Sequence, residues 1–192
     1  MLSFLQQLDG GILLWIQENL RSPLLTGIFT FITRLGDGGF IWILLTILLL
    51  IPKKTRKAAF SMAAALIWSL IITNLLLKNS VARVRPYEVV EGLRILIKPP
   101  QDWSFPSGHT SASLAAEVVM LRMLPRKIGI PGIILAALIS LSRLYAGVHY
   151  PTDVLGGAVI GVICALLGEI CVKWADEKIR RRKEGDGHGQ GG

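Results

Sequence analysis

A histidine and an aspartate four residues apart, His149 and Asp153, form the pair in this sequence best suited to chemistry. A carboxylate at that spacing can accept a hydrogen bond from the ring, fix its tautomer and raise the basicity of the free nitrogen, as a nucleophile or base requires. Arg143 ends the preceding apolar run, and Pro151 suits the first turn of a following helix. A capping aspartate at a helix start is the structural alternative for Asp153.

A second polar cluster, Ser107-Gly108-His109, follows Pro106 and stands directly before an apolar run that begins at Thr110. The first backbone N–H groups of a helix are free and lie at the positive end of its dipole, so this segment is a candidate anion site. A histidine there could donate a proton to a departing oxygen. A plain helix start with an interfacial histidine explains the same residues equally well.

A third cluster contains Lys78, Arg83, Arg85 and Pro86, where another apolar run ends. Lys78 and Arg85 are seven residues apart, so in a continued helix they would share a face and could hold one anion together. Cations that snorkel to a membrane interface are the alternative interpretation.

The elements that must position these clusters are apolar. Hydrophobic residues make up 52% of the 192 residues and charged residues only 18%, whereas a soluble domain carries about a quarter charged residues. The runs 39–51, 58–77, 110–124, 128–144 and 154–172 predict membrane-spanning helices, and a weaker run at 23–32 predicts a sixth, with five as the alternative. We therefore expect an all-α, polytopic membrane helical bundle of about six transmembrane helices.

The chain reads as a single membrane-embedded domain over 1–183. Its first part, 1–20, is predicted to be an amphipathic helix at the membrane interface. The segment 184–192 is Gly-rich and is predicted to be a disordered tail.

The basic residues predict the orientation. Thirteen of the 21 lie in three clusters, at 53–57, 122–127 and 173–183, and alternating spans bring all three to one side. The positive-inside rule makes that side the cytoplasm and predicts a cytoplasmic C-terminus. Because these clusters flank apolar runs, the net charge of +8 does not indicate a nucleic-acid partner.

The same alternation brings the polar clusters together on the extracytoplasmic face. Three cations with free backbone donors would hold a phosphate, and two histidines would supply a nucleophile and an acid. No carboxylate cluster suits Mg²⁺, so we expect no metal or other cofactor. The residues that meet in this way are Lys78, Arg85, His109, Arg143, His149 and Asp153.

These clusters resemble the three motifs of the type 2 phosphatidic acid phosphatase superfamily. Residues 78–86 read KNSVARVRP, which matches a lysine, six residues and Arg-Pro. Residues 106–109 read PSGH, and residues 142–153 read SRLYAGVHYPTD, which matches Ser-Arg, five residues, a histidine, three residues and an aspartate. All three occur in order, with no departure at a motif position.

The resemblance implies a role for each matched residue. His149 would attack phosphorus and form a phosphohistidine, Asp153 would orient it, and His109 would protonate the leaving oxygen. The phosphoryl oxygens would be bound by Lys78, Arg85, Ser107, the backbone at Gly108, and Arg143.

The superfamily also limits the substrate. Its vanadate-dependent haloperoxidases are normally soluble, so an apolar chain such as this one does not resemble them. About thirty residues separate Lys78 from His109, which leaves no room for a large soluble cap over the site. An outward-facing site suits undecaprenyl diphosphate, a carrier lipid, in the membrane bilayer. The alternative substrates are phosphatidylglycerophosphate and phosphatidic acid, and the alternative reaction is transfer of phosphate to another lipid. A non-enzymatic membrane protein is a further alternative, but such a protein would be expected to have lost a motif residue. The sequence is silent on oligomeric state.

Overall fold

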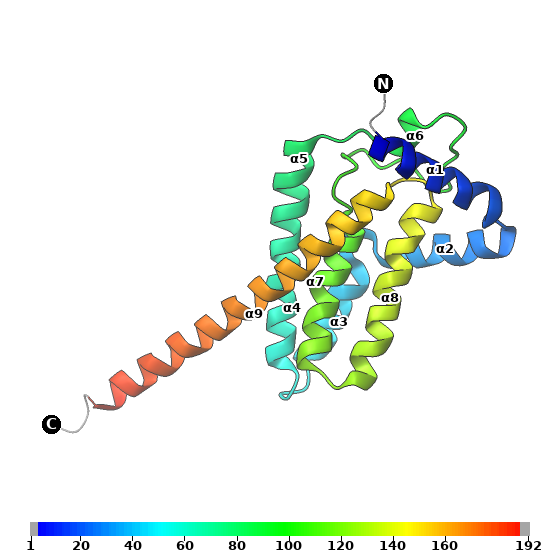
Figure 1. The fold of residues 1–192 in the computed structure, drawn as a ribbon. Helices are drawn as coiled ribbons and strands as arrows, with labels where there is room; N and C mark the ends of the chain where they lie inside the picture. The colour runs from blue at the N-terminus through cyan, green and yellow to red at the C-terminus, as the bar shows by residue number, and fades with distance from the viewer. Residues whose placement is uncertain (1–3, 189–192) are drawn as a thin grey trace.

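In the computed structural model, which describes residues 4–188 and the side chains of 4–182, every regular element is a helix (Figure 1). In chain order these are α1 (Phe4–Asn19), α2 (Pro23–Leu35), η1 (Asp37–Gly39), α3 (Phe40–Leu50), α4 (Arg56–Ser69), η2 (Leu70–Leu77), α5 (Lys78–Val81), α6 (Pro86–Val89), α7 (Gly108–Met123), α8 (Arg126–Tyr145) and α9 (Pro151–His188).

Helix α7 stands at the centre of the bundle and packs against α3, α4, α8 and α9. Small side chains allow these helices to approach closely, as is usual between membrane helices. Gly157 and Gly161 of α9 show how close they are, because a Cβ there would stand 2.6 Å from the carbonyl oxygen of Ser107, the N-cap of α7, or of Ser111 in α7. The core between the helices contains Trp42, Met62, Ala115, Val119, Ala136, Ile139, Cys164 and Ala165.

Three continuous helical stretches are long and apolar enough to cross a membrane: Arg56–Val89, Arg126–Tyr145 and Pro151–Arg182. The pair Pro23–Leu35 and Asp37–Leu50 passes the same test together and is bent by 48°, which gives up to four spans. Large apolar side chains are exposed on the outer faces, as lipid contact requires. The predicted all-α membrane bundle is confirmed, whereas the count of six spans is not.

Two of the expected spans differ from the prediction for physical reasons. Helix α7 has only 16 residues; because its neighbours enclose it, it needs no long lipid-facing apolar surface. The weak run at 23–32 belongs to α2, which is separated from α3 by a Gly-rich turn where Gly38 and Gly39 adopt positive φ. That turn produces the bend between α2 and α3.

Helix α1 lies across one end of the bundle, near α6 and the start of α9 (Figure 1). It turns Asp9, Gly10 and Leu13 inward. Its outer face exposes apolar side chains, among them Phe4 and Trp15. An interfacial location of the segment 1–20 remains a prediction, and residues 1–3 lie outside the described residues.

Helix α9 projects beyond the rest of the bundle at its C-terminal end (Figure 1). It continues to His188, into the first five residues of the segment 184–192 that the sequence predicts as a disordered tail. Lysine, arginine and glutamate are good helix formers, and a run of them precedes that segment. Residues 189–192 of the predicted tail lie outside the described residues.

Candidate active site

A cavity of about 1340 Å³ opens between α3, α4 and the connections at the α1 end of the bundle. Its polar walls carry six of the predicted site residues: Lys78, Arg85, Gly108, His109, Arg143 and His149. Its apolar walls come from α3, α4 and the start of η2, with Ile43, Ile47, Leu50, Leu66, Ile67 and Leu70. The cavity therefore joins a cationic end to a hydrocarbon-like groove.

The turn between α8 and α9 holds His149, which is 1% exposed. Its Nδ1 lies 3.4 Å from Asp153 Oδ2, a long contact of the kind that tightens when substrate binds. Asp153 Oδ2 also accepts hydrogen bonds from the Tyr150 backbone N–H, at 2.9 Å, and from the Ser104 hydroxyl. A carboxylate held in this way selects the tautomer with a proton on Nδ1, so Nε2 carries the lone pair; Arg85 Nη1 lies 3.4 Å from it.

Burial lowers the pKa of His149 to about 3, against the opposing effect of Asp153. The positive charges of Arg143 and Arg85 contribute to this low pKa. The ring is therefore neutral near pH 7, which is the state a nucleophile needs.

His109 stands in the first turn of α7, with Nε2 2.9 Å from Asp37 Oδ1 of η1. Burial lowers the pKa of His109, and the Asp37 carboxylate opposes this by favouring the protonated ring, so the pair can hold a proton for a leaving group. Gly36 makes the approach possible, because a Cβ there would stand 2.7 Å from His109 Cδ2 and 2.8 Å from Ile139 Cγ2. Asp37 and His109 both line the cavity.

Three of the cations that line the cavity are at most 6% exposed: Lys78, Arg85 and Arg143. Lys78 Nζ and Arg85 Nη2 both contact the carboxylate of Asp102, the arginine at 2.5 Å. Arg143 Nη1 donates to Thr33 Oγ1 at 2.6 Å, while its buried Nε finds no hydrogen-bond partner within the described part of the chain. A buried donor of this kind is suited to an incoming anion.

The segment that leads to Lys78 is a π-helix, η2, and wide turns of this kind frequently occur at functional sites. It brings the Asn74 side chain to the start of α7, 3.1 Å from where a Cβ on Gly108 would stand. The same Cβ would be 4.0 Å from Lys78 Nζ. Glycine thus leaves the N-terminus of α7 open toward the lysine.

Two predicted site residues lie behind the cavity wall. Ser107 is fully buried as the N-cap of α7, where its hydroxyl accepts from the Thr110 N–H at 3.4 Å. Its own N–H donates to the Asp153 carbonyl at 3.0 Å, which ties α7 to α9. A direct contact between Ser107 and phosphate remains a prediction, and Asp153 reaches the cavity only through His149.

Comparison with known proteins agrees with this geometry. The PAP2 superfamily matches residues 54–177. The chain belongs to this superfamily. It is 36% identical to the undecaprenyl-diphosphatase of Sulfolobus acidocaldarius over 137 residues, 71% of this chain and 66% of that one. It is 37% identical to the undecaprenyl-diphosphatase BcrC of Bacillus subtilis over 147 residues, 77% of this chain and 75% of that one.

A solved structure gives the same result. The crystal structure of a transmembrane PAP2-type phosphatidylglycerolphosphate phosphatase from Bacillus subtilis is 28% identical, with a TM-score of 0.72 over 93% of this chain and 89% of that one. The resemblance drawn from the three motifs is confirmed, and this PAP2 protein is a membrane phosphatase.

The sequence does not predict three residues of the PAP2 site: Asp37, Asp102 and Arg83. Asp37 contacts His109 across 72 positions, and Asp102 contacts Lys78 across 24. The sequence places Arg83 in a basic cluster but does not predict its ion pair with Asp153. The signals were weak: an aspartate in a Gly-rich turn, an aspartate just before the PSGH motif, and a third cation beside Arg85.

Proposed function

We propose that this PAP2 protein removes phosphate from a membrane lipid phosphate or diphosphate through a phosphohistidine formed on His149. One observation carries the proposal: a single cavity joins two histidines and three cations to the apolar walls of α3 and α4. A charged head group and a hydrocarbon chain fit such a space together, whereas a water-soluble phosphate ester needs only its polar end.

The first step forms a bond from His149 Nε2 to phosphorus and breaks the bond from phosphorus to the leaving oxygen. His109 gives its proton to that oxygen. In the second step water attacks phosphorus, His109 takes the proton from the water, and the bond between Nε2 and phosphorus breaks. Both steps keep the nucleophile opposite the leaving group, as phosphoryl transfer requires.

The cations stabilise the charge of the phosphoryl group in both steps. Lys78 and Arg85 already hold an anion, the Asp102 carboxylate, whose oxygens stand in for two phosphoryl oxygens. The Nε of Arg143, which has no hydrogen-bond partner among the described residues, is available for a third. Burial alone would raise the pKa of Asp102, but Lys78 and Arg85 hold it at about 2, so the stand-in is an anion at working pH.

Undecaprenyl diphosphate is the substrate we propose first. Two relatives bear the name undecaprenyl-diphosphatase. The apolar wall extends to Leu50 at the end of α3, and eleven helical residues extend roughly 16 Å at 1.5 Å each. An isoprenoid or acyl chain fits that groove, so the order of the substrates rests on the names of the relatives. Phosphatidylglycerophosphate comes second, because the solved relative acts on that lipid by its name.

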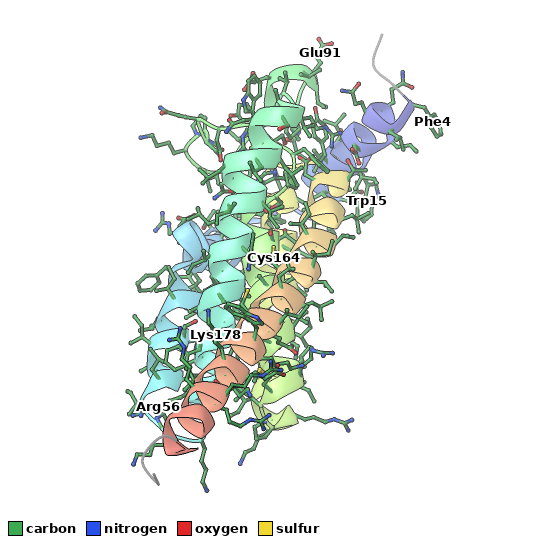
Figure 2. The ribbon with its side chains drawn as sticks, turned by 90° about the vertical axis from the view of Figure 1, so that its left-hand side faces the viewer. Phe4, Trp15, Arg56, Glu91, Cys164 and Lys178 are labelled. Carbon is green, nitrogen blue, oxygen red and sulfur yellow. The ribbon has the colours of Figure 1, made fainter. Side chains whose placement is uncertain are left out.

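We also propose that the site faces the extracytoplasmic side and that the C-terminus is cytoplasmic. Figure 2 places Arg56 and Lys178 at one end of the bundle and Glu91 and Phe4 at the other. The basic end is the cytoplasmic one under the positive-inside rule. A cysteine at Gln101, which is exposed in the connection before α7, is expected to react with an impermeant thiol reagent in intact cells. Reaction only after lysis would reverse the orientation.

Phosphate release by the purified protein in detergent tests the function. Undecaprenyl diphosphate, phosphatidylglycerophosphate and phosphatidic acid are compared with EDTA present, and we expect the first to give the highest kcat/KM. A strict need for added metal would contradict the mechanism. Full turnover by His149→Ala would exclude His149 as the nucleophile, and labelled phosphate recovered on a second lipid, without release, would make the protein a transferase.

A further inference from the structure

Helix α1 lies outside the segment that matches the PAP2 superfamily. Its buried acid, Asp9, is nevertheless connected to Asp153, the carboxylate that contacts the proposed nucleophile. Asp9 is 3% exposed, and its Oδ2 accepts a hydrogen bond from Arg83 Nη2 at 2.8 Å. The other terminal nitrogen of Arg83, Nη1, donates to Asp153 Oδ1 at 2.6 Å. One guanidinium therefore joins a carboxylate of α1 to the carboxylate that contacts His149.

We infer that Arg83 and Asp9 are positioning residues of the phosphatase reaction, which fix the orientation and the charge of Asp153 and, through it, of His149. The inference rests on the proposed role of His149 as nucleophile. It gives the N-terminal helix a task in the reaction that the three motifs do not contain.

The Arg83 guanidinium is fixed by several hydrogen bonds and by an aromatic ring. Its Nη1 also donates to Thr152 Oγ1 at 2.7 Å, and its plane lies 4.0 Å from the centre of the Tyr150 ring. The Thr152 hydroxyl in turn donates to Asp9, and the Thr152 backbone N–H donates to the other Asp9 oxygen at 3.3 Å. A planar fork bound in this way has few alternative positions, which an ammonium group could not reproduce.

Helix α1 is itself fixed beside the α8–α9 turn. Leu13 is fully buried and packs with Leu93 and Tyr150 in a small apolar cluster. Farther along the helix, Gln17 Nε2 donates to the Gly92 carbonyl at 3.0 Å. The contact of Asp9 with Arg83 is therefore part of a docked interface.

The backbone before Arg83 has an uncommon conformation. Ala82 ends α5 at φ 47° and ψ 43°, in the left-handed region that residues with a side chain seldom adopt. The turn is followed by a hydrogen bond from the Ser104 N–H to the Arg83 carbonyl at 2.9 Å. Because the Ser104 hydroxyl donates to Asp153, both the side chain and the backbone of Arg83 connect to that carboxylate. Strain of this kind persists where surrounding contacts require it.

The charges explain why the arginine needs a second acid. An arginine paired with Asp153 alone would offset the negative charge that supports the ring at Nδ1. With Asp9 present, two carboxylates share one guanidinium, and the group keeps one net negative charge. That charge stabilises the positive charge that develops on the His149 ring as Nε2 bonds to phosphorus.

The other charged side chains that face the His149 ring are cations. Arg85 Nη1 lies 3.4 Å from Nε2, and Arg143 faces the ring from α8. Both oppose a positive ring, so the reaction depends on the negative charge on the Nδ1 side. Loss of that charge is expected to slow the bond-forming step more than it weakens phosphate binding.

The test compares Asp9→Asn with the unchanged full-length protein in detergent. The substrate is p-nitrophenyl phosphate, which makes the result independent of which lipid the protein prefers. We expect kcat to fall about 10-fold while KM stays within about twofold. Inhibition by orthovanadate, which must bond to the nucleophile, is expected to weaken about 10-fold as well. Inhibition by inorganic phosphate, which depends on the cations, is expected to stay unchanged.

A matched control and a second variant keep the result decisive. Glu18→Gln removes an exposed charge from the same helix and is expected to leave every constant unchanged. If Asp9→Asn loses its cooperative thermal transition, Arg83→Lys replaces it, since lysine keeps the charge but not the fork. We expect the same fall in kcat from Arg83→Lys. Normal kcat in a folded variant, or equal weakening by vanadate and phosphate, would overturn the inference and leave the proposed lipid phosphatase function intact.

Discussion

His149 and His109 are each held by a carboxylate, but the two regions that hold them differ in burial and in origin. Asp153 is fully buried, comes from the next helical turn after His149 and has four hydrogen-bond donors around it. Asp37 comes from a turn 72 residues away, and its side chain is 61% exposed. One carboxylate is locked in place; the other stands at an open cavity wall.

The difference corresponds to the two tasks. A nucleophile needs a fixed direction of attack and a ring that stays neutral, which burial and a fixed acceptor provide. An acid must regain a proton in every turnover, so contact with water is an advantage. The comparison predicts that changes at the Asp153 side are more costly than equivalent changes at the Asp37 side.

The largest effect is expected from Asp153→Asn. The amide keeps the shape but removes the charge and can favour the wrong tautomer of His149, so kcat is expected to fall about 10²- to 10³-fold. Steady-state turnover of a lipid phosphate in detergent measures this. Asp176→Asn, which removes an exposed aspartate from the same helix, serves as the control. A loss of less than about 10-fold would remove the contrast between the two regions.

Contacts between residues that are close in the sequence could be predicted, whereas contacts between distant residues could not. His149 and Asp153 are four residues apart on a turn and a helix start, so their contact follows from helical geometry. Lys78 and Arg85 were expected on one face of a continued helix. Instead, α5 ends at Val81 with Ala82 as its C-cap, so Lys78 reaches the cavity from the helix and Arg85 from the extended segment that follows it.

The other region depends on packing that the sequence pattern does not specify. Asp37 meets His109 because α2 and α3 break at a Gly-rich turn and that turn packs against α7. The conformation of the connection that carries Asp102 likewise follows from tertiary contacts. Hydrophobic periodicity predicts where helices are, but it carries no information on which turn meets which helix end.

The next effect tests the packing of His109. Gly36→Ala puts a methyl group 2.7 Å from His109 Cδ2, so the ring must move. A shift of this size is expected to lower kcat about 30-fold, since small misplacements of a catalytic group cost up to about 10²-fold. Gly27→Ala in the preceding helix α2, where a Cβ meets nothing within 4 Å, is the matched control. Equal activity of the two variants would show that the position of His109 is not critical.

A smaller effect is expected from Asp37→Asn. The amide can still contact Nε2 but no longer stabilises the protonated ring, so kcat on a lipid phosphate is expected to fall about 10-fold. Because the acid must carry a proton, the pH at which activity declines on the alkaline side is expected to move to a lower value. p-Nitrophenyl phosphate, whose leaving group needs little protonation, is expected to lose less activity. An equal loss on both substrates would contradict the role of His109 as the acid.

The smallest effect is expected at Asp102, which contacts the cations Lys78 and Arg85 and neither histidine. Asp102 is half-exposed, and its pKa of about 2 keeps it ionised, so it competes with the substrate phosphate for Lys78 and Arg85. Because solvent screens the half-exposed carboxylate, its competition with phosphate is weak, and Asp102→Asn is expected to lower KM and the phosphate inhibition constant about threefold, with kcat nearly unchanged. Glu91→Gln removes an exposed charge from the same connection and is expected to change neither constant. A higher KM for Asp102→Asn would mean that the carboxylate holds the cations in place for the substrate instead of competing with it.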